Sequence, residues 1–351
     1  MSIYDCETWI KDIDEILYTI PWISDLSGKS IMITGASGLV CSAIVDILIR
    51  YNESHIEPIQ IIAAGRSRNK ITERFDRYSF SPYFKIIEYD ATKTKLDIAN
   101  RVDFIIHGAS NSSPDMISKE PVETMLSNFF GLHSLLRYAK DNAVNRILYI
   151  SSSEVYGKKE SNKPFQENQY GFVDLLIPRN SYAVGKRAAE TLCISYSDEY
   201  GVESVIVRPG HIYGPTAMIT DKHVSSQWAY DAANGKNIVM KSNGTQLRSY
   251  CYCLDSAAAI ITALIKGENC HAYNISNPNS VISIRQMAEI LSSCAESELK
   301  IELANEEEKK TFNPMDNSSL DSSALIKLGW KGMFDAETGL SHTVEILKEL
   351  R

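Results

Sequence analysis

Tyr182 and Lys186 are the side chains of this sequence whose types and spacing most directly suggest chemistry. On a helix this spacing places both side chains on one face, because a turn takes about 3.6 residues. An ammonium beside a phenol favours the phenolate, and so lowers a pKa that is about 10 in free tyrosine. The pair is therefore a candidate general base, although a surface tyrosine beside a solvated lysine has the same pattern.

Three hydroxyl-bearing residues and a carboxylate stand upstream of this pair. Residues 146–150 are apolar enough for a buried strand, and Ser151, Ser152, Ser153 and Glu154 follow at its end. Ligands bind at the carboxyl ends of strands in open parallel sheets, so a hydrogen-bonding catalyst would lie here. A serine-rich capped turn is the alternative interpretation.

A glycine-rich turn provides a place for a cofactor. Residues 30–34 predict a strand, Gly35 and Gly38 follow, and a helix is expected to open at Ser42. A strand, a glycine turn and a helix form the setting in which a dinucleotide pyrophosphate meets backbone amides and the positive helix end. Cys41 takes the place of a third glycine as a small residue at the helix–strand contact. The contacts expected here are Gly35, Ser37, Gly38, Leu39 and Val40.

The end of the second predicted strand, residues 59–64, bears on which dinucleotide binds. An acidic residue there would hydrogen-bond the ribose 2′-hydroxyl of NAD, whereas arginine accommodates the 2′-phosphate of NADP. The chain has Arg66, Ser67 and Arg68 instead of an acid. This favours NADP over NAD, with solvated loop charges as the alternative.

Further strands are predicted at residues 85–90, 102–110 and 204–209, and a long helix surrounds Asn128. Strands that alternate with helices predict an α/β fold of the Rossmann type, a doubly wound parallel sheet. A smaller mixed α/β region for the substrate would follow. The remaining expected cofactor contacts are Asp90, Ala91, Gly108, Ala109, Ser110, Asn128, Pro209 and His211, with Asp90 directed at the adenine amino group.

Composition excludes several classes of protein. The 351 residues include 36 basic and 44 acidic side chains, a net charge of −8 that does not suit nucleic-acid binding. No apolar run is long enough to cross a membrane and no signal-like segment opens the chain, so a cytoplasmic protein is expected. No histidine or cysteine spacing suggests a metal site. Cys251 and Cys253 are predicted on one strand, and all seven cysteines are expected to be buried free thiols.

Three segments are expected along the chain. Residues 1–28 carry apolar side chains at helical spacing and form an added helix that packs on the domain or on a partner subunit. Residues 29–208 form the dinucleotide-binding domain. Residues 209–351 form mainly the substrate region, with some chain returning to the sheet.

In this order the motifs resemble the extended short-chain dehydrogenase/reductase family of nucleotide-sugar-modifying enzymes, the NAD-dependent epimerases and dehydratases. The resemblance runs from about Lys29 to the C-terminus. It is greatest for UDP-glucuronate decarboxylases, whose Pro-Arg-x-x-Tyr-x-x-Gly-Lys-Arg pattern stands here at residues 178–187, and for NDP-hexose 4,6-dehydratases. The other motifs are the glycine turn, residues 107–109, residues 151–157, Arg208-Pro209 with Tyr213-Gly214-Pro215, Gly244 with Arg248, and Leu328-Gly329-Trp330.

The resemblance implies roles for individual residues. Tyr182 would take a proton from a sugar hydroxyl, at C4, as hydride passes to NAD(P), with Ser152 hydrogen-bonded to the same oxygen. Lys186 would lower the pKa of Tyr182 and hold the nicotinamide ribose. Ser153 and Glu154 would act on the keto intermediate, which loses CO2 or water. The expected substrate contacts are Ser112, Arg179, His211 and Arg248, with Arg248 paired to the nucleotide diphosphate.

Several departures keep alternatives open. Decarboxylases have Gly-Arg-Val where this chain has Lys222-His223-Val224, and an asparagine where it has His211. An NDP-sugar 4-epimerase is therefore an alternative to a lyase, and a non-catalytic NAD(P)-binding regulator is an alternative of another class. The resemblance also implies a homodimer built through two helices of each subunit.

Overall fold

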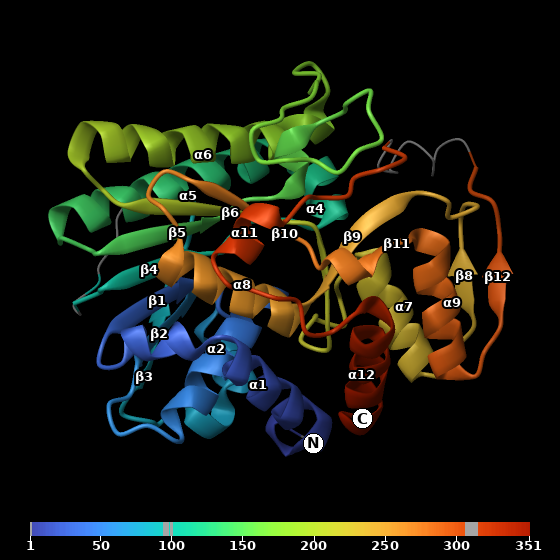
Figure 1. The fold of residues 1–351 in the computed structure, drawn as a ribbon, viewed down its shortest axis with the longest axis horizontal. Helices are drawn as coiled ribbons and strands as arrows, with labels where there is room; N and C mark the ends of the chain where they lie inside the picture. Colours follow the sequence, from blue (N-terminus) through green and yellow to red (C-terminus); the bar gives the residue numbers. More distant parts are fainter. Residues whose placement is uncertain (1, 94–97, 99–100, 306–314) are drawn as a thin grey trace.

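The structure is a computed structural model that describes residues 2–93, 98, 101–305 and 315–351 (Figure 1). In this part of the chain a seven-stranded parallel sheet has the order β10-β6-β5-β4-β1-β2-β3. The α/β fold with a doubly wound parallel sheet is thus confirmed. Its strands are β1 (Ser30–Thr34), β2 (Gln60–Gly65), β3 (Phe84–Glu88), β4 (Phe104–His107), β5 (Arg146–Ile150), β6 (Ser204–Pro209) and β10 (Ala272–Ile275).

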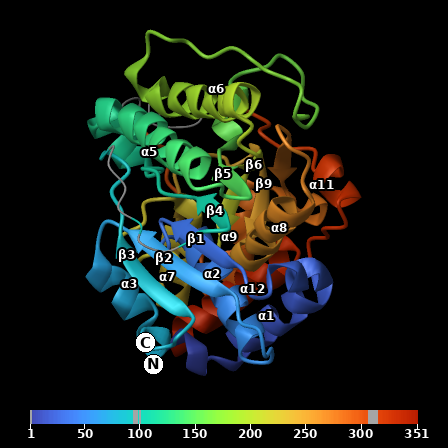
Figure 2. The ribbon, with the colours of Figure 1, turned by 90° about the vertical axis from the view of Figure 1, so that its left-hand side faces the viewer.

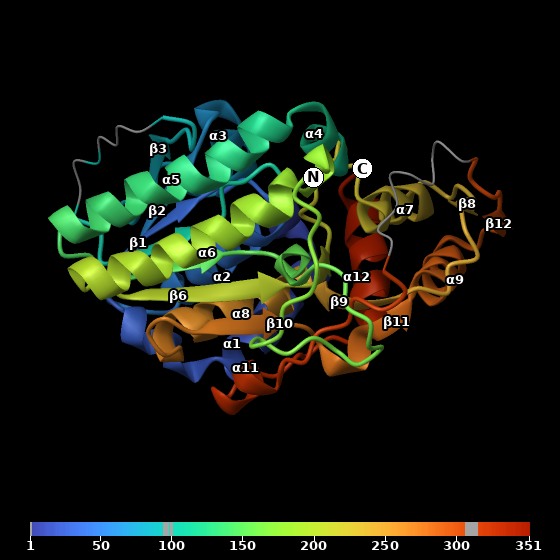
Figure 3. The same cartoon turned by 90° about the horizontal axis from the view of Figure 1, so that it is seen from above.

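Helices cover both faces of this sheet. Helices α5 (Pro121–Asp141) and α6 (Ser181–Tyr200) lie on one face, and α2 (Leu39–Asn52) and α8 (Cys253–Lys266) lie on the other (Figures 1 and 3). Strand β1 is buried throughout because its alternate side chains enter two different cores. Ile31 and Ile33 belong to the core with α2 and α8, whereas Met32 belongs to the core with α5. The shorter α3 (Arg68–Arg74) and α4 (Pro114–Lys119) follow β2 and β4.

The chain after β6 builds a smaller mixed region beside the sheet (Figure 1). Strands β7 (His211–Tyr213), β9 (Leu247–Tyr252) and β11 (Val281–Ser283) form a three-stranded sheet, and β8 (Ile238–Met240) pairs with β12 (Leu299–Ile301). The helices of this region are α7 (Val224–Ala233), α9 (Ile284–Ala295) and α12 (Ala336–Glu349), whereas the short α11 (Ser323–Lys327) packs against β10 of the large sheet. The short 3-10 helices among the described residues are η1 (Ile3–Asp5), η2 (Pro21–Leu26), η3 (Asp76–Tyr78), η4 (Ser153–Tyr156), η5 (Pro178–Asn180) and η6 (Pro278–Ser280).

The N-terminal segment forms helix α1 (Glu7–Thr19), which packs against α2, α8 and α12 of its own chain. Figure 2 shows α1 and α2 on the side of the sheet opposite α5 and α6. Trp9, Ile13 and Ile16 are buried because they repeat at helical spacing on one side of α1. The buried carboxylate of Asp12 accepts a hydrogen bond from the Tyr252 hydroxyl at 3.0 Å and lies 3.0 Å from His342 Nδ1. The segment therefore joins the dinucleotide-binding half to the last helix.

Three local predictions from the sequence are corrected. Helix α2 begins at Leu39 rather than at Ser42, because Gly38 with extended backbone already caps it. Cys253 is the first residue of α8 and not part of a strand with Cys251. Cys270 and Cys294 are half-buried, while the other five cysteines are buried free thiols as expected. Within the described residues, no helix combines the length and hydrophobicity that a bilayer-spanning segment requires.

Candidate active site at the carboxyl ends of the strands

Tyr182 and Lys186 lie in the first two turns of α6, and both side chains are buried against the end of β5. The Lys186 ammonium donates a hydrogen bond to the carbonyl of Ile150 at 2.8 Å. It lies 5.7 Å from the centre of the Tyr182 ring and 4.7 Å from that of Tyr149. The helical spacing thus brings the phenol and the ammonium to the same end of the same strand.

The pKa of Tyr182 is raised, whereas a neighbouring ammonium was expected to lower it. Burial raises the pKa of this phenol above 10, and the carboxylate of Glu154 raises it further. The hydrogen bond with Ser152 and the charge of Arg179 lower it, but by less than burial raises it. Burial also lowers the pKa of Lys186 to about 7, because its charged form loses water. Burial, rather than the charge of Lys186, therefore dominates the acidity of the phenol.

The segment after β5 places three of the predicted residues around Tyr182. Ser152 caps η4 by accepting a hydrogen bond from the amide of Glu154 at 3.2 Å, and its hydroxyl is also hydrogen-bonded to Tyr182. Ser153 begins η4 and is half-buried. The Glu154 carboxylate accepts two hydrogen bonds from the Arg179 guanidinium, at 2.5 and 3.0 Å. Such a paired contact fixes the orientation of both groups.

The glycine turn has the geometry that a dinucleotide requires. Gly35 has φ +72°, and a Cβ there would lie 3.0 Å from the amide nitrogen of Ala109. Gly38 precedes the first turn of α2, in which the backbone amides of Leu39 and Val40 lie at the start of the helix. A Cβ at Gly108 would collide with the sulfur of Cys41, so a small residue is needed at this helix–strand contact, as predicted. The residues present therefore fit a bound pyrophosphate.

The other expected cofactor residues lie along the same edge of the sheet. Asn128 on α5 accepts a hydrogen bond from the Ser110 hydroxyl at 2.9 Å. Ala91 packs against Gly131, where a Cβ would meet it at 2.7 Å. Ala109 and Pro209 lie at or just beyond the ends of β4 and β6, and Ser37 lies in the glycine turn.

The residues after β2 are held in different ways. The Ser67 hydroxyl caps α3 by accepting from the amide of Lys70, and Arg68 donates to the carbonyl of Ile86 at 2.8 Å. Asp90 accepts hydrogen bonds from Thr92, and the charge of Arg66 helps to lower the pKa of Asp90. Arg66 and Asp90 therefore lie within electrostatic range of each other, whereas Arg68 is held against β3.

The predicted substrate residues connect to this centre through the smaller region. His211 on β7 pairs with Tyr250 on β9, two residues from Arg248. Burial and, to a smaller extent, the charge of Arg248 lower the pKa of His211 to about 3. The Nδ1 atom of His211 is buried without a hydrogen-bond partner among the described residues. Arg248 is buried, donates to the carbonyl of Leu247 at 2.8 Å, and forms no ion pair with any described carboxylate. These buried polar groups are available to an anion.

Asp221 and His223 were not singled out from the sequence as site residues, but they lie near the predicted ones. His223 Nδ1 is 2.7 Å from the Asp221 carboxylate, and the His223 ring is hydrogen-bonded to the carbonyl of Ser112. The charges of Glu154 and His211 act across the same space, because Glu154 raises the pKa of His223 and His223 lowers that of His211. In the sequence, the one signal for His223 was that Lys222-His223-Val224 replaces the Gly-Arg-Val of the decarboxylases.

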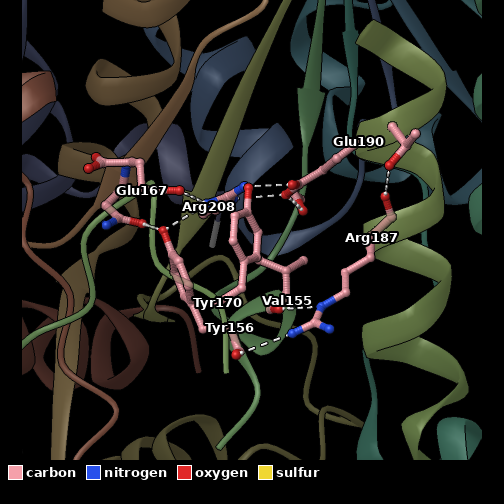
Figure 4. Close-up of polar contacts among 10 residues, drawn as sticks. Val155, Tyr156, Glu167, Tyr170, Arg187, Glu190 and Arg208 are labelled. Atoms are coloured by element: carbon pink, nitrogen blue, oxygen red, sulfur yellow. Dashed lines mark hydrogen bonds and ion pairs between the residues drawn. The ribbon is translucent and has the colours of Figure 1, made fainter. Parts of the chain in front are cut away.

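Arg208 and Arg187 hold the segment after β5 and the helix α6 together through hydrogen bonds (Figure 4). Arg208 is buried and donates two hydrogen bonds to Glu190, at 3.0 and 2.7 Å, and one to Tyr156. Arg187 donates to the carbonyls of Val155 and Tyr156. Glu190 also accepts from Ser151 at 2.5 Å. The basic residues of the Pro-Arg-x-x-Tyr and Arg-Pro motifs therefore fix the segment that carries Ser152 and Glu154.

A hollow of about 360 Å³ opens elsewhere, at the amino ends of β1 and β2. Its lining includes Lys29, Gln60, Lys85 and Arg101, and none of the candidate site residues named in this subsection lines it. The candidate site is defined by the converging side chains at the opposite end of the strands.

The chain is similar in sequence to curated proteins and in fold to solved structures. UDP-glucuronic acid decarboxylase 6 of Arabidopsis thaliana is 30% identical over 314 residues, which cover 90% of this chain and 87% of the relative. Two solved structures share the fold. UDP-glucose 4-epimerase of Thermotoga maritima, solved with UDP-glucose, has a TM-score of 0.78 at 21% identity and covers 92% of this chain and 99% of its own. The dTDP-glucose 4,6-dehydratase of Bacillus anthracis, solved with NAD, has a TM-score of 0.76 at 17% identity, with 92% and 97% covered.

The sequence profile described as the NAD dependent epimerase/dehydratase family matches residues 31–276. This span includes the glycine turn, η4, the start of α6 and Arg248. The chain therefore belongs to the NAD-dependent epimerase/dehydratase family of extended short-chain dehydrogenases/reductases.

Proposed function

We propose that this protein is a nucleotide-sugar lyase that oxidises its sugar, at C4, and then removes CO2 or water from the keto intermediate. The convergence of Ser152, Tyr182 and Lys186 beside the glycine turn carries this proposal. A pure cofactor-binding regulator would have no need of all three. Bound NAD(P) would supply the acceptor for hydride.

The first step belongs to the buried phenol. As the phenolate, Tyr182 removes the proton of the C4 hydroxyl, while the Ser152 hydroxyl, already hydrogen-bonded to this phenol, binds the same sugar oxygen. The positive charge of bound NAD(P)+ would favour the phenolate against the burial that raises its pKa. The Lys186 ammonium lies 5.7 Å from the centre of the Tyr182 ring and, as in the family, would hold the nicotinamide ribose. The group that moves the proton and the group that positions the oxygen thus come from α6 and from the end of β5.

We assign the second step to Ser153 and Glu154 on η4. A 4-keto group makes loss of CO2 or removal of the neighbouring proton easier, and Ser153 and Glu154 are the next polar residues along the chain from Ser152. The paired contact with Arg179 holds the Glu154 carboxylate near Tyr182. Arg179 would thereby position Glu154 at the substrate.

The buried guanidinium of Arg248, which forms no ion pair within the part of the chain that the structure describes, supports a diphosphate substrate. A charge this deeply buried is costly unless an opposite charge meets it, and a diphosphate provides one through bidentate contacts. The decarboxylase from Arabidopsis and the epimerase from Thermotoga carry UDP-sugars in their names. A nucleotide-diphosphate sugar is therefore the substrate class that we propose here.

For the cofactor we propose that Arg66 gives the site affinity for the 2′-phosphate of NADP, on a fold whose family is described as NAD dependent. No acid follows β2, and Arg66 extends near Asp90. Arg68 is engaged with β3, which leaves Arg66 as the arginine for this contact.

The reaction type can be tested with purified protein and a panel of nucleotide sugars. Mass spectrometry of the products would distinguish loss of CO2 from loss of water, and either result supports a lyase. A product of unchanged mass would identify the 4-epimerase that the shared fold with the Thermotoga enzyme makes the second candidate. Binding of NAD(P) without turnover of any sugar would instead identify a regulator.

A further inference from the structure

Glu190 continues the face of α6 that carries Tyr182 and Lys186. The three residues follow one another at a spacing of four, so their side chains lie along one side of the helix. All three are buried, and Glu190 is only 6% exposed. A carboxylate this deeply buried is costly unless donors meet its oxygens, so its hydrogen bonds show what it holds in place.

Arg208 on β6 fixes the carboxylate of Glu190. The guanidinium donates from Nε to Oε1 at 3.0 Å and from Nη2 to Oε2 at 2.7 Å (Figure 4). Arg208 is itself 2% exposed, and it also donates to the hydroxyls of Tyr156 and Tyr170, each at 3.0 Å. A bidentate pair between two held groups sets the direction of both carboxylate oxygens.

The remaining hydrogen bond of Glu190 leads to the peptide that joins Ile150 to Ser151. The Ser151 hydroxyl donates to Glu190 Oε1 at 2.5 Å, and the Ser151 amide donates to the carbonyl of Val207 at 2.8 Å. The carbonyl of Ile150, which belongs to the same peptide, accepts from Lys186 at 2.8 Å. One peptide at the end of β5 is therefore held by β6 and by two side chains of α6.

The orientation of this peptide bears on both groups that act at the sugar oxygen. Among the described residues the Lys186 ammonium has one hydrogen-bond acceptor, the carbonyl of Ile150. Ser152 follows the peptide directly, and its hydroxyl is hydrogen-bonded to Tyr182. A rotation of the peptide would therefore move the acceptor of the ammonium and the start of the segment that carries the serine.

We propose that Glu190, held by Arg208, is a positioning residue that sets Lys186 for the nicotinamide ribose through the hydroxyl of Ser151. This inference rests on the proposed function, because it takes the role of Lys186 from it. Without the bond to Glu190 the peptide is free to turn, and the Ile150 carbonyl no longer fixes the ammonium. Binding of the nicotinamide half should then weaken, whereas the adenosine diphosphate half, which would lie at the glycine turn, should bind as before.

Ser151→Ala removes the connection and leaves the pair of Glu190 and Arg208 intact. Calorimetric titration with NAD and with ADP measures its effect, because ADP lacks the nicotinamide ribose. We expect the Kd for NAD to rise roughly tenfold, as for loss of one hydrogen bond to a charged group, and the Kd for ADP to stay within roughly twofold. Thr343→Val removes an equally buried hydroxyl from α12 and is the control that should alter neither Kd.

Removal of the ion pair tests whether Glu190 acts through Ser151. Glu190→Leu combined with Arg208→Met replaces both charges, so that neither is left buried without its partner. This variant should weaken NAD binding as Ser151→Ala does. Addition of Ser151→Ala to it should change the Kd for NAD by no more than roughly twofold, because the connection is already broken.

The outcomes separate the role of Glu190 from the proposed function. An unchanged Kd for NAD in Ser151→Ala, an equal weakening of NAD and ADP, or effects that multiply in the combined variant would overturn that role. In steady-state kinetics Ser151→Ala should lower kcat roughly tenfold and leave the KM of the sugar within roughly twofold. A wild type that turns over no nucleotide sugar would overturn the proposed function, while the titrations, which need no sugar, decide the role of Glu190. Thermal unfolding establishes that each variant is folded, and Ser151→Ala is decisive even if the ion-pair variant unfolds.

Discussion

At the scale of single residues, the phenol of Tyr182 is subject to opposing influences. Burial and Glu154 raise its pKa, and Ser152 and Arg179 lower it. The sequence indicated the helical pairing with Lys186 but not this balance, because burial depends on segments that are distant along the chain. What matters chemically is that the phenol is both buried and hydrogen-bonded to a serine hydroxyl.

Removal of the phenolic hydroxyl tests its role as general acid–base. We predict that Tyr182→Phe lowers kcat by a factor of roughly 10² or more, because proton transfer at the sugar oxygen is lost. Steady-state kinetics on the best substrate of the panel measures this. Activity within a few-fold of wild type would remove Tyr182 from the reaction.

Arg66 and Arg68 form a matched pair for the cofactor proposal. Arg66→Ala should weaken NADP binding roughly tenfold and leave NAD binding unchanged, because only NADP carries the 2′-phosphate. Arg68→Ala, which removes a hydrogen bond to β3, is the control and should alter neither affinity. Fluorescence titration with both dinucleotides gives the four values. An equal preference for NAD and NADP in the wild type and in Arg66→Ala would refute the assignment.

At the scale of elements, the strand–turn–helix unit at residues 30–52 was predictable because its apolar run, its glycines and its helix follow one another directly. Its details were less so: the helix opens three residues before Ser42, and Cys253 starts a helix. The contact of His223 with Ser112 could not be predicted, since it joins the loop before α7 to the loop after β4. Loop conformation, rather than periodicity, decides such contacts.

Helix α5 bears an exposed apolar stripe that fits the homodimer implied by the resemblance. Val122, Leu126 and Phe130 are 61%, 42% and 38% exposed, and their spacing of four places them on one face. We predict that the wild type is a dimer in sedimentation equilibrium and that Leu126→Glu dissociates it. A charge introduced at Phe80, which is 96% exposed on a loop, is the control and should have no effect. A monomeric wild type would contradict the prediction.

At the scale of the whole molecule, the N-terminal segment connects the two parts that form the site, through Tyr4 on η1 and Asp12 on α1. Tyr4 donates to Asp46 on α2 at 2.7 Å, and Asp12 contacts Tyr252 on β9 and His342 on α12. The sequence predicted that this helix is amphipathic and left open whether it packs on its own domain or on a partner. These buried polar contacts join the segment to α2, β9 and α12 of its own chain.

Asp12 makes the stability of this junction depend on pH. Burial raises the pKa of Asp12 from 3.8 to about 6, so its contribution is complete at low pH and is lost as the pH rises through 6. The loss is at most about 3 kcal/mol of unfolding free energy. Asp12→Asn should abolish this loss while it keeps an acceptor for Tyr252.

Urea denaturation between about pH 4 and pH 7 measures the difference between the two proteins. The stability of the wild type should fall relative to Asp12→Asn as the pH rises. Asp14→Asn, on the solvent side of the same helix, is the control. Parallel curves for wild type and Asp12→Asn would show that the pKa of Asp12 is the same in the folded and the unfolded chain.

The central claim is that oxidation at C4 prepares chemistry at the neighbouring carbon. Loss of CO2 or of water from a 4-keto sugar leaves that carbon to be reprotonated by exchangeable protons, whereas a 4-epimerase never opens it. The direct measurement is therefore the reaction in D2O with a nucleotide sugar that the protein turns over, followed by NMR of the product. The proposal predicts deuterium at the carbon next to C4, and a product without deuterium there would contradict it.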